Sequence, residues 1–217
     1  MPFDLEIEAL LASGIEEDDQ VAAYISKLGH IHQQFIREIK PTHEPLTTAK
    51  ALFDWLWVTK PTRYELHGSY RLSEVIDSHL KEDSKAVGNC LGLTLLYNCL
   101  LRRVGMDPGA LYLENAFGTG PHVLTILRTK DFTIDIENIL REGFDYKGHL
   151  NDPSRVRWGN KELIADIYCS RGNEGYVKGD YREALKDYDR AINLNPSHER
   201  ARLNKVILLD KMQMKER

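Results

Sequence analysis

Apolar residues recur at intervals of three and four along the first third of the chain, which is the spacing of an amphipathic helix. Between Asp19 and Ile36 they fall at Val21, Tyr24, Ile25, Leu28, Ile31 and Phe35. The same spacing returns over 46–58, after two prolines, and a shorter helix is expected over 70–80. The opening third is therefore predicted to be mostly helical.

The pattern changes in the middle of the chain, where apolar residues gather in short runs. The runs 110–113, 122–127 and 132–136 are rich in branched and aromatic residues, and turns bearing glycine, proline or aspartate separate them. The stretch from Leu91 to Leu101 is apolar on nearly every side, as in a central buried helix. We expect an α+β fold, with helices packed on a small antiparallel sheet of three strands.

An irregular stretch, 143–159, separates this region from a second helical one. It contains Gly148 and the turn sequence Asn151-Asp152-Pro153-Ser154, which indicates a linker or a wrapping loop. Within it, the run Arg155-Val156-Arg157-Trp158 fits either an anion clamp or a solvated linker. We place the domain boundary here, with residues 1–158 on one side and 159–217 on the other.

Residues 165–198 have the length and residue offsets of one tetratricopeptide repeat, and 199–214 would form a closing helix. The matching positions are Tyr168, Gly172, Tyr176, Gly179, Asp180, Tyr181, Ala184, Tyr188, Ala191 and Pro196. The repeat departs from the usual pattern at Arg171 and Gly175. One repeat is too short for a free-standing solenoid, so it either buttresses the fold or forms a peptide-binding groove. Tyr168, Tyr176 and Tyr188 are the candidate partner-binding residues.

Composition and charge limit the classes of function. The chain has 217 residues, 42% of them hydrophobic, and a formal net charge of -4, so a folded protein without a nucleic-acid or anionic-membrane partner is expected. The first residues do not resemble a signal peptide, and no apolar run reaches the roughly 18 residues of a membrane span. These features predict a cytoplasmic protein, which could have a protein or peptide as its partner.

Metal and disulfide chemistry find little support in the sequence. The three cysteines are scattered and form no Cys-x-x-Cys pair, so reduced thiols are expected. His30 and His32 would diverge on a helix and could not bind one metal ion together. We expect no metal and no cofactor.

Cys90 follows Gly88 and Asn89 at the start of the predicted buried helix. A helix N-terminus favours a thiolate, because its N–H groups lack helical partners and carry partial positive charge. Asn89 is the expected cap and, where its side chain is not used in capping, an oxyanion donor. The alternative is that Cys90 is a small core residue, which is how Cys99 and Cys169 are interpreted.

His122 and Asp135 favour the catalytic interpretation of Cys90. His122 opens a strand after Gly118-Thr119-Gly120-Pro121, and Asp135 lies on the next strand, between two isoleucines. A buried carboxylate at that position needs a partner, and His122 is the predicted one. Cysteine, histidine and aspartate would then act as nucleophile, base and orienting acid.

This order of residues resembles the transglutaminase-like superfamily, and most closely its compact SirB-type branch, in which tetratricopeptide helices follow the core. The resemblance covers about 72–138 for the core and continues through the trailing helices to about 214. It implies a papain-like fold with Cys90 as nucleophile, His122 as general base and acid, and Asp135 as its orienting partner. Leu91 stands where classical members commonly have an aromatic residue, and no counterpart of their calcium-binding insertions is present.

Two functions follow as alternatives. The first is a cysteine hydrolase or acyltransferase that attacks a carboxamide or peptide bond through a thioester at Cys90, with either water or an amine as acceptor. The second is a catalytically silent scaffold that holds a protein partner through its tetratricopeptide segment.

Overall fold

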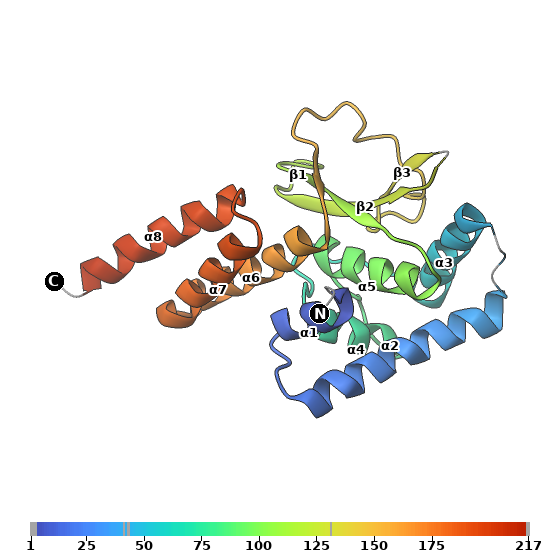
Figure 1. Ribbon diagram of the computed structural model, residues 1–217, viewed down its shortest axis with the longest axis horizontal. Helices are drawn as coiled ribbons and strands as arrows, with labels where there is room; N and C mark the ends of the chain where they lie inside the picture. Colours follow the sequence, from blue (N-terminus) through green and yellow to red (C-terminus); the bar gives the residue numbers. More distant parts are fainter. Residues whose placement is uncertain (1–3, 41, 43, 131, 216–217) are drawn as a thin grey trace. The chain divides into compact units, whose positions relative to one another are not determined.

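A computed structural model describes residues 4–40, 42, 44–130 and 132–215. The chain divides into two compact units, Met1–Trp158 and Gly159–Arg217, and each is described by itself. The helices of the first unit are α1 (Leu5–Ala12), α2 (Asp18–Ile39), α3 (Pro45–Thr59), α4 (Leu72–Leu80) and α5 (Cys90–Arg103). Its strands are β1 (Gly109–Leu113), β2 (His122–Arg128), β3 (Thr133–Ile136) and β4 (Val156–Trp158) (Figure 1).

The strands form one antiparallel sheet in the order β3-β2-β1-β4, so the α+β prediction is confirmed. The fourth strand, β4, falls in the stretch that the sequence analysis interpreted as a linker or loop, and that interpretation is wrong for these residues. β4 has three residues, two of them exposed, and so carries no clear alternation. Tertiary packing stabilises it, since Trp158 stacks on Tyr112 of β1 with ring centroids 4.3 Å apart.

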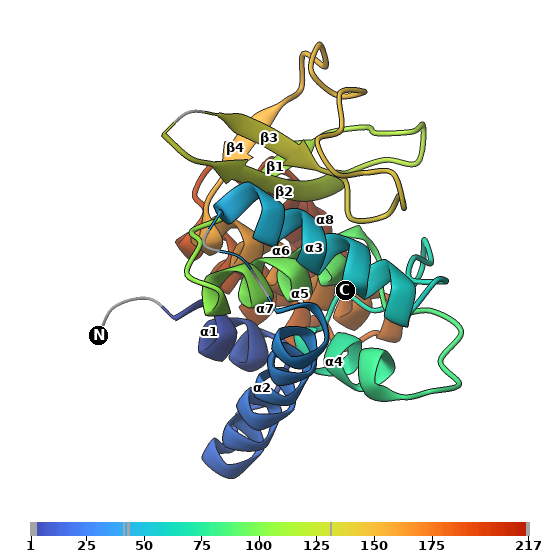
Figure 2. The ribbon, with the colours of Figure 1, turned by 90° about the vertical axis from the view of Figure 1, so that its right-hand side faces the viewer.

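Helix α5 is the centre of the first unit. Every residue from Leu91 to Leu101 is buried, as its apolar composition predicts. Helices α3 and α5 lie on one side of the sheet, and part of the chain between β3 and β4 lies on the other (Figure 2). The start of α5, where Cys90 lies, is thereby held against the sheet.

A buried polar network fixes how α5 sits on strand β2. Thr125 of β2 donates a hydrogen bond to Asn98 Oδ1 of α5 at 2.7 Å and accepts one from Asn138 Nδ2 at 2.9 Å. Thr94 of α5 donates to the carbonyl oxygen of Val123 in β2 at 3.2 Å. Such bonds are directional, so they define the position of the helix along the strand better than apolar contacts alone.

The second unit contains α6 (Asn160–Lys178), α7 (Tyr181–Leu194) and α8 (Glu199–Lys215). Gly179, with φ +84°, ends α6 in the left-handed conformation that glycine favours. A Cβ at Gly172 would lie 2.5 Å from the ring of Tyr188, so the small residue lets α6 and α7 approach. Among the described residues, no helix is both long and apolar enough to cross a membrane.

The polar network gives a testable prediction for Thr125→Val, which keeps the shape of the side chain and removes its hydroxyl group. Asn98 and Asn138 each lose a buried partner, so we expect the free energy of unfolding to fall by about 1 to 3 kcal/mol. Urea denaturation measures this change. Thr133→Val, at an exposed position of β3, is the matched control and should change stability little. Equal effects of the two substitutions would contradict the proposed role of the network.

Candidate functional site

Cys90 is the first residue of α5 and is partly exposed. The turn before it is held by a neighbouring segment, because the Asn89 amide donates to the Ser69 carbonyl at 2.9 Å and the Val87 amide donates to the Arg63 carbonyl at 2.8 Å. A side chain at Gly92 would collide with the Ser69 backbone, so this glycine allows the close approach. The sulfur is thus placed at a helix N-terminus by backbone contacts.

Asn89 has the capping role expected of it. Its Oδ1 accepts a hydrogen bond from the Gly92 amide at 3.1 Å. The other two cysteines differ from Cys90: Cys99 and Cys169 are buried, and burial raises the pKa of both thiols, to about 11 for Cys169. Among the three cysteines, only Cys90 combines exposure with a helix N-terminus.

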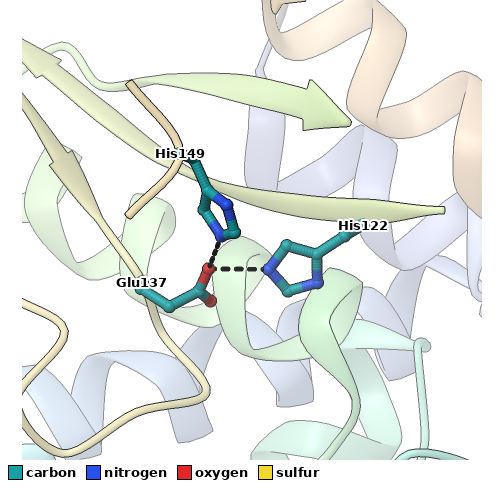
Figure 3. A group of neighbouring side chains, drawn as sticks. All are labelled: His122, Glu137 and His149. Atoms are coloured by element: carbon teal, nitrogen blue, oxygen red, sulfur yellow. Dashed lines mark hydrogen bonds and ion pairs between the residues drawn. The ribbon is translucent and has the colours of Figure 1, made fainter. Parts of the chain in front are cut away.

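His122, the first residue of β2, links Cys90 to a carboxylate. The Cys90 side chain is near enough to the ring to raise its pKa, and the ring's Nε2 lies 2.8 Å from Oε2 of Glu137. Figure 3 shows the other ring nitrogen pointing away from Glu137, so Nδ1 is the nitrogen available to Cys90. Burial lowers the pKa of His122, but the hydrogen bonds to Cys90 and Glu137 outweigh it and raise the pKa to about 10.

Glu137, directly after β3, is the carboxylate of this cluster and is fully buried. Burial by itself would raise its pKa, yet the hydrogen bonds from His122 and His149 produce a net lowering, which keeps the group ionised. The loop that follows is tight, because the Glu137 amide donates to the Gly143 carbonyl at 2.8 Å. A Cβ at Gly143 would collide with the backbone of Glu137, so glycine is required there.

The structure corrects the partner that the sequence analysis assigned to His122. Asp135 is ion-paired with Arg155, at 2.6 Å and 3.3 Å from its two guanidinium nitrogens. It lies opposite Ile126 in the β2–β3 ladder. Ile126 is four residues from His122 along β2, a distance of about 13 Å at about 3.3 Å per residue. Glu137 lies on the same face of the sheet but two residues nearer to His122. The expected need of Asp135 for a buried partner is met by Arg155.

His149 also belongs to the site, although no motif marks it in the sequence. His149 Nε2 lies 3.2 Å from the same Glu137 oxygen that His122 contacts. The carbonyl oxygen of His149 accepts a hydrogen bond from Arg155 at 3.0 Å, so the Asp135–Arg155 pair holds the loop that carries this histidine. Arg155 therefore binds an anion within the protein itself, the carboxylate of Asp135. The stretch before β4 is a loop that wraps over the sheet.

Two aromatic residues that the sequence analysis also missed border the cluster. Phe117 is 47% exposed, and its ring centroid lies 5.6 Å from that of His122 and 4.9 Å from that of His149. Its φ of +54° is unusual for a residue with a side chain. Burial raises the pKa of Tyr64, and the nearby charges of Cys90 and Glu137 raise it further.

The three candidate partner-binding tyrosines differ in exposure. Tyr188 is buried, packs on Gly172 and donates a hydrogen bond to Asn173 at 2.9 Å, which is a packing role. Tyr168 is 9% exposed, whereas Tyr176 is only partly buried. A binding surface on this unit would therefore draw on Tyr176 more than on Tyr188.

Comparison with protein families finds a tetratricopeptide repeat at residues 165–198, which confirms the predicted repeat. Comparison with curated proteins and with solved structures gave no match. The chain therefore contains a tetratricopeptide repeat after an α+β unit.

A double-mutant cycle tests the role of Asp135 and Arg155. Arg155→Met leaves the buried Asp135 carboxylate without its ion pair and should lower the free energy of unfolding by about 3 kcal/mol. Asp135→Asn in the same chain should recover part of that loss, giving a coupling energy of at least about 1 kcal/mol. The exposed pair Lys147 and Asp145, changed in the same way, is the control and should show weaker coupling. Strict additivity at Asp135 and Arg155 would contradict the interpretation.

Proposed function

We propose that this protein is a cysteine-dependent acyl-transfer enzyme of the transglutaminase-like type. Cys90 is the nucleophile, His122 is the general base and acid, and Glu137 takes the orienting role first assigned to Asp135. The observation that carries the proposal is the His122 ring, whose Nε2 lies 2.8 Å from Glu137 Oε2 and whose pKa is raised by the nearby Cys90 side chain as well as by Glu137. A thiol, an imidazole and a carboxylate in this order are the groups that nucleophilic acyl transfer needs.

The reaction begins from the charged form of His122. Because its pKa is raised to about 10, the ring already holds the thiol's proton at Nδ1 at neutral pH, and the Cys90 sulfur attacks the carbonyl carbon of a carboxamide or peptide bond. The C–N bond then breaks, the departing amine receives the proton from His122, and the acyl group stays on sulfur as a thioester. Water or a second amine then attacks the thioester and gives its proton to the now neutral His122, and the C–S bond breaks, which returns the Cys90 sulfur beside the charged ring.

Glu137 and the start of α5 support these steps. Glu137 accepts the Nε2–H of His122, which fixes the tautomer that leaves Nδ1 facing sulfur and stabilises the charged ring. The oxyanion would accept a hydrogen bond from the backbone N–H of Cys90 at the helix start. Asn89 Oδ1 accepts the hydrogen bond of the Gly92 amide, and the side-chain amide nitrogen, Nδ2, is the candidate for a second donor.

The surroundings of Cys90 are compatible with a substrate. Cys90 is partly exposed although His122 and Glu137 are buried, so an acyl group could reach sulfur while the proton-transfer groups stay dry. The exposed ring of Phe117 beside His122 offers an apolar surface for the substrate's side chain. The packing of α5 on strand β2 is compatible with the papain-like core that the proposal implies.

Alkylation of Cys90 at neutral pH, followed residue by residue by mass spectrometry, tests the proposal. With iodoacetamide, we expect Cys90 to react roughly 10-fold faster in the folded protein than in the denatured chain. The reason is that only the thiolate is nucleophilic, and the proposal has His122 and the start of α5 favour that form. The advantage should be lost in His122→Ala and reduced in Glu137→Gln. Buried Cys99 and Cys169 should stay unlabelled in the folded protein.

Matched variants separate this chemistry from damage to the fold. Glu142→Gln removes an exposed carboxylate from the loop that follows Glu137, and His67→Ala removes an exposed histidine two residues before Ser69, so neither should change the labelling rate. Urea denaturation of each variant shows whether it is folded. Labelling of Cys90 no faster than that of an ordinary thiol in the folded wild-type protein would overturn the enzymatic proposal.

The scaffold function is the second candidate, and the tetratricopeptide repeat favours it. Such repeats commonly bind proteins, and α8 exposes apolar side chains at Leu203, Val206 and Met214. This function predicts a protein partner whose binding survives Cys90→Ala and is weakened by Tyr176→Ala. The enzymatic proposal instead predicts that Cys90→Ala abolishes covalent capture of an acyl donor.

A further inference from the structure

Two buried clusters of metal-ligand side chains occur among the described residues, one in each unit. They are His122, Glu137 and His149 in the first, and Asp166, Cys169 and His198 in the second. In the second cluster the Arg200 guanidinium is already bound to Asp166, so a cation would have to displace it. His198 also uses its Nδ1 to accept a hydrogen bond from the Ala201 amide at 3.3 Å. The first cluster is the stronger candidate.

We propose that His122 Nε2, Glu137 Oε2 and His149 Nε2 together bind one divalent transition-metal ion, with zinc as the best match. All three atoms lie within 4.8 Å of one another, although they come from β2, the end of β3 and a distant loop. Figure 3 shows both imidazole rings directing a nitrogen at the same carboxylate oxygen. Two imidazoles and one carboxylate are a common zinc ligand set, whereas calcium and magnesium prefer oxygen ligands.

The two nitrogen-to-oxygen distances are close to the separation of two ligands on one zinc ion. Zinc lies about 2.0 to 2.2 Å from nitrogen and oxygen ligands, so two tetrahedral ligands are about 3.3 Å apart. The two nitrogen-to-oxygen distances are 2.8 Å and 3.2 Å, and because both nitrogens point at this oxygen, the Glu137 carboxylate has to turn aside for the ion to lie between the three atoms.

The ligands are also supported from outside, as ligands in metal sites usually are. Oε1 of Glu137 accepts a hydrogen bond from the Ile139 amide at 3.4 Å. The backbone of His149 is held by Arg155, which is fixed in turn by Asp135. The three side chains are 0 to 7% exposed, so an ion would be shielded from solvent.

Metal binding would exclude the proton transfer of the proposed function, and this consequence rests on that function. A neutral imidazole has one nitrogen lone pair, and a metal at Nε2 of His122 uses it. The remaining ring proton then stays on Nδ1, so this nitrogen cannot accept the proton of the Cys90 thiol. The metal-bound protein would therefore be unable to start acyl transfer.

Isothermal titration of the full-length protein with zinc chloride, after removal of metals with a chelator, tests the site without reference to activity. We expect one zinc ion per chain for the wild-type protein. His149→Gln keeps an N–H donor for Glu137 but lacks an imidazole ligand, so the affinity should fall at least about 10-fold. His30→Gln removes an exposed histidine of α2 and is the matched control, with binding unchanged.

Cys90→Ser separates this site from zinc bound at the thiol. Sulfur is not among the proposed ligands, so the variant should still bind one zinc ion. Binding that is lost in Cys90→Ser and kept in His149→Gln would overturn the proposal, as would a wild-type protein that binds no zinc. If urea denaturation shows that His149→Gln is not folded, Glu137→Gln serves in its place, because it removes another ligand and must also weaken zinc binding. A negative result here leaves the alkylation test of Cys90 unaffected.

Discussion

A single buried carboxylate, Glu137, is the constraint on which this site depends. An ionised carboxylate without solvent exposure is costly unless hydrogen-bond donors surround it. Glu137 meets this requirement with two imidazoles, from the start of β2 and from the loop between β3 and β4. The same contacts fix the orientation of the His122 ring, and so determine which nitrogen faces Cys90. The requirement for stability and the requirement for catalysis are thus met by one set of hydrogen bonds.

The remainder of the first unit positions Cys90 at the side of the His122 ring that faces away from Glu137. Helix α5 must place the Cys90 sulfur within reach of a histidine that belongs to the sheet, and the bonds of Thr94 and Thr125 define where the helix lies on β2. Close approach at Gly92 lets the start of α5 pack against the Ser69 segment. On the opposite face of the sheet, the Asp135–Arg155 pair fixes the loop bearing His149.

Much of this arrangement could be predicted from local sequence. The cap at Asn89, the apolar run of α5 and the turn before His122 are local signals, and they placed Cys90 at a helix start and His122 at a strand start. The offsets of the tetratricopeptide repeat were likewise sufficient, because its helices pack through small residues at defined positions. The choice between Asp135 and Glu137 was different, since both lie on one face of the sheet and only the register separates them. His149 and Phe117 lie in loops, where no periodicity marks a residue that packs against a distant strand.

The titration of His122, followed by NMR of its imidazole resonances, tests most directly whether Glu137 is the partner that orients this ring. We expect the wild-type ring to titrate at a pKa of about 10 and Glu137→Gln to lower that pKa, since a hydrogen-bonded carboxylate favours the charged ring. Asp135→Asn should leave the titration close to that of the wild-type protein. A wild-type ring that titrates near 6.5, or one that responds to Asp135→Asn and not to Glu137→Gln, would contradict the account.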